Sequence, residues 1–293
     1  MEGKKLIIID SHSLLYRAFH ALPPLVNSKG QPTGAIYGFL LTLFKAIKDV
    51  EANYVVACFD TPKTTFRHQA FREYKAHRAA MPEGIVSQIP LVKEVLQSFG
   101  IPIFEKDGYE ADDVVATISQ TAKQDAEVYI VSGDLDNLQL VDQRVNVYTL
   151  GRGIKDSVVY NTEKVVERFG VNPEQMNDFK ALTGDVSDNI PGVPGVGKTT
   201  AAELIQKYQS IENLYSELAT DTAVVKPKIK EALKQNKEKA FLSLKLVKTD
   251  KNVPIDFVLE SCKFGDFNKE KVKSIFLELG FNSLVERIDS LSK

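Results

Sequence analysis

Three runs of apolar residues that each end in an aspartate constrain the fold of this chain more than any other feature. They cover residues 4–10, 54–60 and 128–134 and end at Asp10, Asp60 and Asp134. Continuous apolar runs rich in β-branched residues are typical of strands in a parallel sheet that is covered on both faces. Two shorter strands are expected at 145–150 and 158–160.

Helical patterns lie between these strands, at 35–50, 85–99 and 112–123. This alternation indicates βαβ units and an α/β fold. Strand-like runs disappear after residue 170, and helices are expected at 173–182, 199–208, 211–218, 226–245 and 269–279. We therefore predict two domains: a parallel-sheet domain over residues 1–170 and a helical domain over residues 171–293.

The composition indicates an ordinary globular protein. Of the 293 residues 43% are hydrophobic, which excludes a disordered chain. Two cysteines, Cys58 and Cys262, are too few for a disulfide scaffold and suit a reducing compartment. Because every apolar run is too short for a membrane span or a signal peptide, we expect a cytoplasmic protein without a membrane partner.

The net charge of −2 argues at first against a nucleic-acid ligand. Acids, however, are placed where ligands bind in open α/β sheets, beyond the carboxyl ends of the strands. The strand-end acids are joined by six others near a helix start and two turns: Glu110, Asp112, Asp113, Asp136, Asp185 and Asp188. If these nine acids share one site, the rest of the chain carries a net positive charge.

Any one of these acids could be a simple cap or turn residue. Together they would repel one another unless a cation neutralised them. Oxygen ligands without neighbouring His or Cys favour Mg²⁺ or Mn²⁺, and two such ions can support cleavage of a phosphodiester. The sequence therefore predicts a site for two or more divalent ions at the edge of the sheet.

The segment 192–199 fits the phosphate-loop pattern G-x-x-x-x-G-K-T of ATPases. That pattern requires a buried strand before it, and the preceding residues 185–191 are polar, acidic and end in proline. We therefore expect no ATP. The segment is interpreted as a hairpin between two helices whose backbone N–H groups hold a DNA phosphate. A purely structural turn is the alternative.

The segment 65–78 mixes cations with aromatic residues. Near an acidic metal site, such cations hold phosphates and the aromatic rings stack on unpaired bases. Arg17, which follows Asp10 closely, could act in the same way. A solvated helix face is the alternative interpretation.

Taken in order, these motifs resemble the 5′-nuclease domain of bacterial DNA polymerase I, a member of the flap-endonuclease superfamily. The matching stretches are collinear over about residues 6–290: Asp10 with 15–20, 32–35, 59–60, 65–67 with 74–75 and 77–78, 110–113, 133–136 and 184–193. The resemblance implies a PIN-like sheet domain with a helical arch, followed by a helix–three-turn–helix DNA clamp. It also implies 5′→3′ exonuclease and 5′-flap endonuclease activity with Mg²⁺ or Mn²⁺.

The resemblance also implies roles for individual residues. The first metal would be held by Asp10, Asp60, Glu110 and Asp112, and the second by Asp113, Asp134, Asp136, Asp185 and Asp188. Together with Asp112, Lys75 and Arg78 would act on the scissile phosphate. DNA would contact Arg17, Arg67, Arg72 and Tyr74 and, in the hairpin, Gly192, Val193, Gly195, Gly197, Lys198 and Thr199, with a K⁺ ion bound there.

The implied partners are DNA with 5′ flaps or 5′ ends, RNA primers on DNA, and a functional link to DNA polymerase I, for a monomer at the bacterial nucleoid. Two other functions were weighed. A catalytically silent junction-binding module would lack one or more carboxylates, and none is missing. A PIN-type ribonuclease would not need the hairpin, which suits a long duplex.

Overall fold

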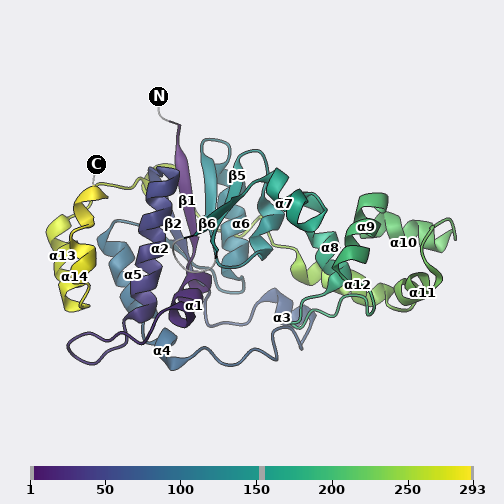
Figure 1. Cartoon of the computed structure of the whole chain (residues 1–293), viewed down its shortest axis with the longest axis horizontal. Helices are drawn as coiled ribbons and strands as arrows, with labels where there is room; N and C mark the ends of the chain where they lie inside the picture. The colour runs from purple at the N-terminus through teal and green to yellow at the C-terminus, as the bar shows by residue number, and fades with distance from the viewer. Residues whose placement is uncertain (1–2, 152–155, 292–293) are drawn as a thin grey trace.

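A six-stranded sheet forms the centre of the molecule (Figure 1). In this computed structural model, which describes residues 3–151 and 156–291, the strand order is β3-β2-β1-β4-β5-β6. The first five strands are parallel, and β6 pairs antiparallel with β5. The strands are Lys5–Asp10 (β1), Tyr54–Cys58 (β2), Ile103–Phe104 (β3), Glu127–Val131 (β4), Val145–Leu150 (β5) and Ser157–Tyr160 (β6). The predicted parallel sheet is thus confirmed.

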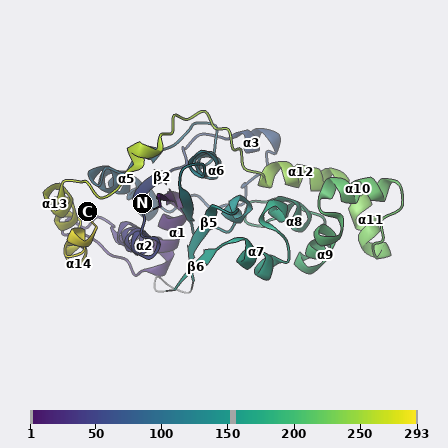
Figure 2. The same ribbon diagram turned by 90° about the horizontal axis from the view of Figure 1, so that it is seen from above.

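Helices cover both faces of the sheet because both faces of its strands are apolar. Successive side chains of β1 point to opposite faces: Ile7 and Ile9 pack with one group of helices, and Leu6 and Ile8 with α6 on the other side. Figure 2 shows α2 and α6 on opposite sides of the strands. These helices are Ser11–Ala21 (α1), Gly34–Val50 (α2), Ile89–Ser98 (α5) and Ala111–Ala122 (α6).

A group of helices extends beyond the β6 edge of the sheet (Figure 1). They are Thr162–Phe169 (α7), Met176–Thr183 (α8), Lys198–Tyr208 (α9), Ile211–Ala219 (α10), Pro227–Gln235 (α11) and Lys237–Val247 (α12). The prediction of one helix over 226–245 is wrong, because the chain leaves the helical conformation at Asn236 (φ −117°, ψ 25°). The side-chain amide of Asn236 donates to the carbonyl of Ala232 at 2.8 Å and so caps α11.

After α12 the chain returns to the sheet and ends at the opposite side of the molecule (Figure 1). There, α13 (Lys269–Glu278) and α14 (Asn282–Val285) join the core between the sheet and α5. The ring of Phe276 in α13 lies 5.9 Å from that of Phe99 at the end of α5. The last part of the predicted second domain, 171–293, therefore packs with the first, because only there is its apolar face covered.

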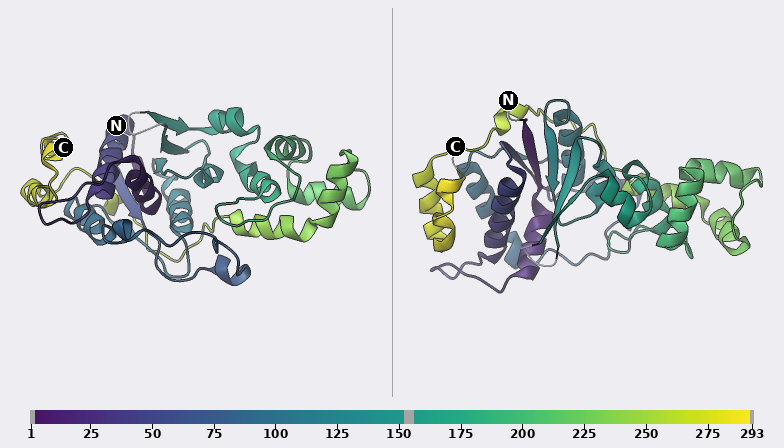
Figure 3. Two further views of the ribbon diagram at one scale, coloured as in Figure 1. Left: turned by 60° about the horizontal axis from the view of Figure 1, so that its bottom comes forward. Right: turned by 45° about the horizontal axis from the view of Figure 1, so that its top comes forward.

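The segment between β2 and α5 is helical only in two short parts, α3 (Phe66–Ala70) and α4 (Glu83–Val86). Turns and extended residues connect them. The predicted single helix over 85–99 is accordingly divided, since Pro90 begins α5 as a separate helix. In Figure 3 (left panel) this segment runs from α3, beside α12, to α4, beneath α1. We call residues 65–86 the arch.

The sequence analysis did not predict α1. Asp10 caps it by accepting a hydrogen bond from the backbone N–H of Ser13 at 3.4 Å, Leu14 and Leu15 are buried in the core, and Ala18 is buried beside Gly38 of α2. Their spacing was a usable helical signal. No helix of the described residues is long and apolar enough to cross a membrane.

Candidate active site

Acids from separate parts of the sequence meet at the carboxyl edge of the sheet. Asp10 ends β1, Asp60 and Asp134 follow β2 and β4, and Glu110 and Asp112 stand at the start of α6. All five line one pocket of about 920 Å³. The carboxyl ends of the parallel strands and the N-terminus of α6 lie at the same edge of the sheet, so the topology itself brings these carboxylates together.

Two of these acids are fixed by hydrogen bonds that the sequence analysis did not anticipate. The hydroxyl of Ser132, which is fully buried, donates to Asp10 Oδ2 at 2.7 Å and accepts from the backbone N–H of Asp134 at 2.9 Å. Asp60 Oδ1 accepts from the N–H of Ala111 at 2.7 Å, which ties β2 to the first turn of α6. Only the position of Ser132 at a strand end signalled its role.

Two carboxyl groups of the pocket, those of Asp10 and Asp112, have raised pKa values. Burial, together with the charge of Asp60, raises the pKa of Asp10 from 3.8 to about 6. Burial and the charges of Asp10 and Asp134 raise the pKa of Asp112 well above its ordinary value. A bound divalent cation would relieve this repulsion.

The donor set of the pocket fits a hard divalent ion. The acids offer only carboxylate oxygens, which suits Mg²⁺ or Mn²⁺. Within residues 3–151 and 156–291, however, no three His, Cys, Asp or Glu side chains are close enough together to coordinate a single ion. The chain's own cations, Lys75 and Arg78, lie among the carboxylates instead. Binding of a metal therefore requires these cations to move away and the carboxylates to come closer together.

Lys75 is the central cation of the pocket. Its ammonium lies 2.9 Å from Glu110 Oε1 and 3.8 Å from Asp188 Oδ2, and the Arg78 guanidinium pairs with Asp188. Burial lowers the pKa of Lys75, but the charges of Glu110 and Asp188 outweigh burial and raise it above its ordinary value. Lys75 also has φ +55°, a left-handed conformation that is strained for a residue with a side chain.

The structure separates Asp136 and Asp185 from this pocket. Neither residue lines it, and the ammonium of Lys180 bridges the two carboxylates, at 3.0 Å from Asp185. Their charges outweigh burial and raise the pKa of Lys180. As they lie here, the two predicted ligands of the second metal form an ion-pair cluster beside the pocket.

Asp113, expected at the second metal, has a structural role. It is fully buried, and its two oxygens accept hydrogen bonds from Arg67 at 2.7 and 2.8 Å. Further bonds come from the N–H groups of Glu110 and Asp250. Because these bonds occupy both of its oxygens, Asp113 is not placed to hold a metal. Arg67, 2% exposed, is likewise not placed to contact DNA as predicted.

Tyr74 also differs from its predicted role as a DNA contact. It is 3% exposed, and its phenol oxygen lies 3.1 Å from Glu110 Oε2 and 3.3 Å from Asp188 Oδ2, so that its single proton is shared between the two carboxylates. Among the other predicted DNA contacts, Arg72 is exposed on the arch. Arg17 is half-buried, and its guanidinium donates to the carbonyl of Gly151.

The segment 192–199 forms the predicted hairpin between two helices, α8 and α9. The N–H of Gly192, at φ +60°, donates to Ser243 Oγ of α12 at 3.0 Å, and a side chain on Gly192 would collide with the backbone of Gly184. Gly192 and Val193 are buried and are not placed to contact DNA. The predicted contacts Gly195, Gly197, Lys198 and Thr199 are exposed.

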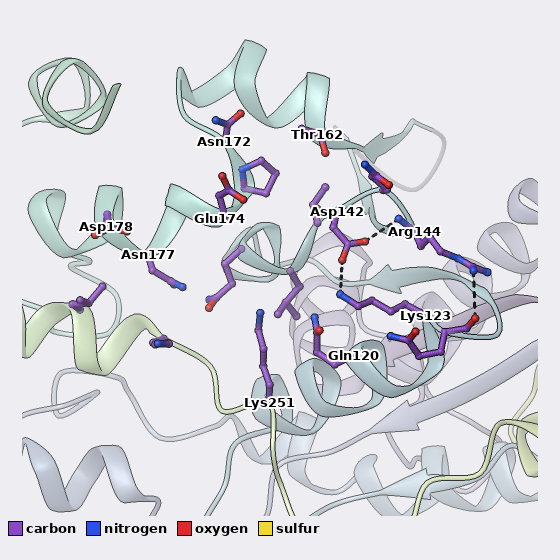
Figure 4. Close-up of a pocket in the computed structure, with 18 of the residues that line it drawn as sticks. Gln120, Lys123, Asp142, Arg144, Thr162, Asn172, Glu174, Asn177, Asp178 and Lys251 are labelled. Carbon is purple, nitrogen blue, oxygen red and sulfur yellow. Dashed lines mark hydrogen bonds and ion pairs between the residues drawn. The ribbon is translucent and has the colours of Figure 1, made fainter. Parts of the chain in front are cut away.

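A second pocket, of about 940 Å³, lies against α6, α7 and α8 (Figure 4). It shares no lining residue with the carboxylate pocket. Cations and acids both line it, and Lys123 pairs with Asp142 across 2.7 Å. Acids and cations are balanced in this pocket, whereas acids outnumber cations in the first one.

Comparison with known proteins identifies the family of the chain. Residues 5–170 match the 5′-3′ exonuclease, N-terminal resolvase-like domain, and residues 171–270 match the 5′-3′ exonuclease, C-terminal SAM fold. The chain belongs to the 5′-3′ exonuclease family. This confirms the resemblance inferred from the motifs.

Relatives in this family are of two lengths. The chain is 39% identical over 289 residues to the 5′-3′ exonuclease of Aquifex aeolicus, covering 98% of this chain and 96% of that one. It is 43% identical over 290 residues to DNA polymerase I of Bacillus caldotenax, covering 99% of this chain but 33% of that protein. The chain therefore spans about a third of the polymerase relatives it matches.

Solved structures share the fold at lower identity. The T5 D15 protein, co-crystallized with metal ions, is 21% identical with a TM-score of 0.70, covering 99% of this chain and 100% of that one. The catalytic core of Rad2 in complex with DNA substrate is 18% identical with a TM-score of 0.64, covering 100% and 93%. The predicted fold class is confirmed as a PIN-like parallel-sheet domain followed by a helical domain, which the family model describes as a SAM fold.

Proposed function

We propose that this chain is a structure-specific 5′→3′ exonuclease and 5′-flap endonuclease. It hydrolyses DNA phosphodiesters near junctions of single and double strands, and it removes flaps and RNA primers in replication and repair. The observation that carries the proposal is the convergence of Asp10, Asp60, Glu110, Asp112 and Asp134 in one pocket beneath Lys75.

In this proposal, Asp10, Asp60, Glu110 and Asp112 hold one divalent ion, and Asp134, with Asp188 at the rim, contributes to a second. When bound, Mg²⁺ or Mn²⁺ supplies an activated water and stabilises the leaving 3′ oxygen. Hydrogen bonds from Ser132 and from the first turn of α6 orient Asp10, Asp60 and Asp134 at the edge of the sheet, from which the side chains would close on a metal. Asp136 and Asp185 would contribute through water, after release of Lys180.

The cations of the arch have two roles in this proposal. Without ligands, Lys75 and Arg78 neutralise Glu110 and Asp188. Once metal and DNA enter, the same ammonium and guanidinium groups turn to the phosphate and stabilise the charge that develops during cleavage.

The helical part of the chain binds the duplex. Gly195, Gly197 and Lys198 at the start of α9 are exposed, and their backbone N–H groups would hold a DNA phosphate without reading of bases. In this scheme residues 1–170 form the catalytic domain and residues 171–293 carry the clamp, with a K⁺ ion at the hairpin. The nuclease acts as a monomer at the nucleoid, in functional association with DNA polymerase I.

A labelled 5′-flap substrate tests this function. With Mg²⁺, we expect a product with a 5′-phosphate that arises from cleavage near the junction, and no product when EDTA is added. Binding of the flap in Ca²⁺ without any cleavage in Mg²⁺ or Mn²⁺ would instead identify a silent junction-binding module. Cleavage of single-stranded RNA in preference to the flap would identify a PIN-type ribonuclease.

A further inference from the structure

Contacts from several parts of the catalytic site converge on residues 246–250, which comprise the end of α12 and the residues directly after it. Gln139 follows the loop that carries Asp134 and Asp136 and is 8% exposed. Its amide donates to the carbonyls of Asp136 and Val247, both at 3.1 Å. Its oxygen accepts from the N–H and the hydroxyl of Thr249, both at 3.1 Å. All four bonds that a glutamine amide can make are therefore used.

A second contact connects the same residues to the start of α6. Arg67 donates from Nε to the carbonyl of Leu246 at 2.9 Å and from Nη2 to that of Lys248 at 3.0 Å, while Nη1 and Nη2 donate to Asp113. The N–H of Asp250 donates to Asp113 as well, at 2.8 Å. Since Asp113 lies beside Asp112, the end of α12 is in contact with the elements that carry both groups of carboxylates.

The same helix contacts the hairpin. Ser243, one turn before the end of α12, is fully buried and accepts the hydrogen bond of the Gly192 N–H. The hairpin is thus joined to α12 by a buried hydrogen bond. Gln139 joins α12 in turn to the Asp134–Asp136 loop, in which Asp134 accepts from the N–H of Asp136 at 2.9 Å.

We propose that Gln139 is a positioning residue that couples duplex binding at the hairpin to metal binding at the carboxylates, by way of α12. Coupling between two ligands is reciprocal, so duplex and metal must each strengthen the other by the same factor. The proposal rests on the proposed function for the identity of the two ligands.

The test compares Gln139→Met with a matched glutamine in the intact chain. Methionine fills a similar volume but makes none of the four hydrogen bonds. Gln175, 6% exposed in the helical part, also makes hydrogen bonds of 3.1 Å, to Gln209 and Asn172, and among the described residues it has no hydrogen bond to α12, so Gln175→Met controls for lost buried bonds. Thr249→Val, which removes a single bond to Gln139, is the milder second variant if Gln139→Met does not fold.

Calorimetry measures Ca²⁺ affinity with and without a blunt DNA duplex, and duplex affinity with and without Ca²⁺. In the unaltered chain and in Gln175→Met, we expect each ligand to tighten the other about tenfold. In Gln139→Met the factor falls below about twofold, and in Thr249→Val it falls between these values. Retained coupling in Gln139→Met, equal loss in Gln175→Met, or no coupling in the unaltered chain would overturn the proposal.

Failure of the proposed function is distinguishable from this result. It appears as absence of flap cleavage by the unaltered chain in Mg²⁺, whatever the coupling factor in Ca²⁺. Loss of coupling in Gln139→Met with flap cleavage by the unaltered chain supports both proposals.

Discussion

The carboxylate pocket and the hairpin, which in the proposed function bind the same DNA, differ in their physical basis: buried charge in the pocket and backbone conformation in the hairpin. In the pocket, buried like charges raise the pKa of Asp10 and Asp112, and Lys75 and Arg78 partly neutralise the acids. The hairpin has no charge cluster; glycine conformations and exposed backbone form its surface. In the proposed function, the pocket would therefore bind metal at the expense of stability, whereas the hairpin would bind DNA through its backbone shape at little electrostatic cost.

The largest expected effect is in the pocket. Asp112→Asn removes a charge that no hairpin group can replace, so cleavage of a flap in Mg²⁺ should fall by about 10³-fold or more. Flap binding in Ca²⁺ should stay nearly intact, because the hairpin is unchanged. Gel-based cleavage and binding assays measure both, with the exposed Asp125→Asn as control. Full cleavage by Asp112→Asn would remove this residue from the metal site.

Lys75→Ala tests whether the arch cation serves chemistry or docking. We expect single-turnover cleavage to slow by about 10²-fold, since a charge next to the developing negative charge is lost. Duplex affinity should change less than about threefold. Lys63→Ala, which removes an exposed cation paired with Asp107, should change neither quantity. The reverse pattern, with affinity lost and rate kept, would assign Lys75 to docking.

Asp10→Asn tests the stability cost of the pocket. At pH 7 in EDTA the native carboxylate is ionised although its pKa is about 6 instead of 3.8, which corresponds to about 3 kcal/mol against folding. The variant should therefore unfold at higher denaturant concentration than the unaltered chain. The gain in the free energy of unfolding should shrink as the pH falls through 6 toward 3.8, because the Asp10 carboxyl of the folded chain is then neutral.

Mg²⁺ should reverse this difference at pH 7. The metal stabilises the unaltered chain by mass action and cannot bind as well to the asparagine variant. Denaturant unfolding followed by circular dichroism, in EDTA and in Mg²⁺, gives both comparisons. If Asp10→Asn were less stable in EDTA at pH 7, burial of this charge would not be costly and the contrast with the hairpin would fail.

In the hairpin, smaller effects are expected. Lys198→Ala should weaken duplex binding about threefold to tenfold and lower the salt dependence of binding by about one charge. Lys207→Ala, at the other end of the same helix, should leave both unchanged because Lys207 lies away from the hairpin. Fluorescence anisotropy at several salt concentrations measures the slope, and equal effects of the two variants would place the duplex along the whole of α9.

ATP should have no effect on either region. The glycine-rich segment joins two helices and lacks the strand that positions a phosphate loop. Calorimetry should detect no saturable ATP binding, and flap cleavage should be the same with and without ATP. Saturable binding would revive the ATPase interpretation.

The convergence of the acids could be predicted from the sequence because parallel strands bring their carboxyl ends to one edge. The parts that could not be predicted depend on tertiary partners. Nothing local to Arg67 indicates that it is buried against Asp113, 46 residues away. Nor does the helical pattern of α13 indicate that it returns to the first domain, because an apolar stripe specifies burial but not the surface that covers it.

Tyr74 is a second example of a side chain whose environment could not be predicted from the sequence. An aromatic residue among cations is typical of a base-stacking surface, yet its ring is buried and its hydroxyl binds Glu110 and Asp188. Motif matching assigned it to DNA because the motif records which residues occur together and not which way they point.

Crystals grown with a 5′-flap DNA and Mn²⁺ test the central claim most directly, through the anomalous scattering of the metal. We predict anomalous peaks within coordination distance of Asp10, Asp60, Glu110, Asp112 and Asp134, with Lys75 withdrawn from Glu110 toward the DNA phosphate. Ordered DNA with no peak among these carboxylates, or with Lys75 still paired to Glu110, would contradict the account.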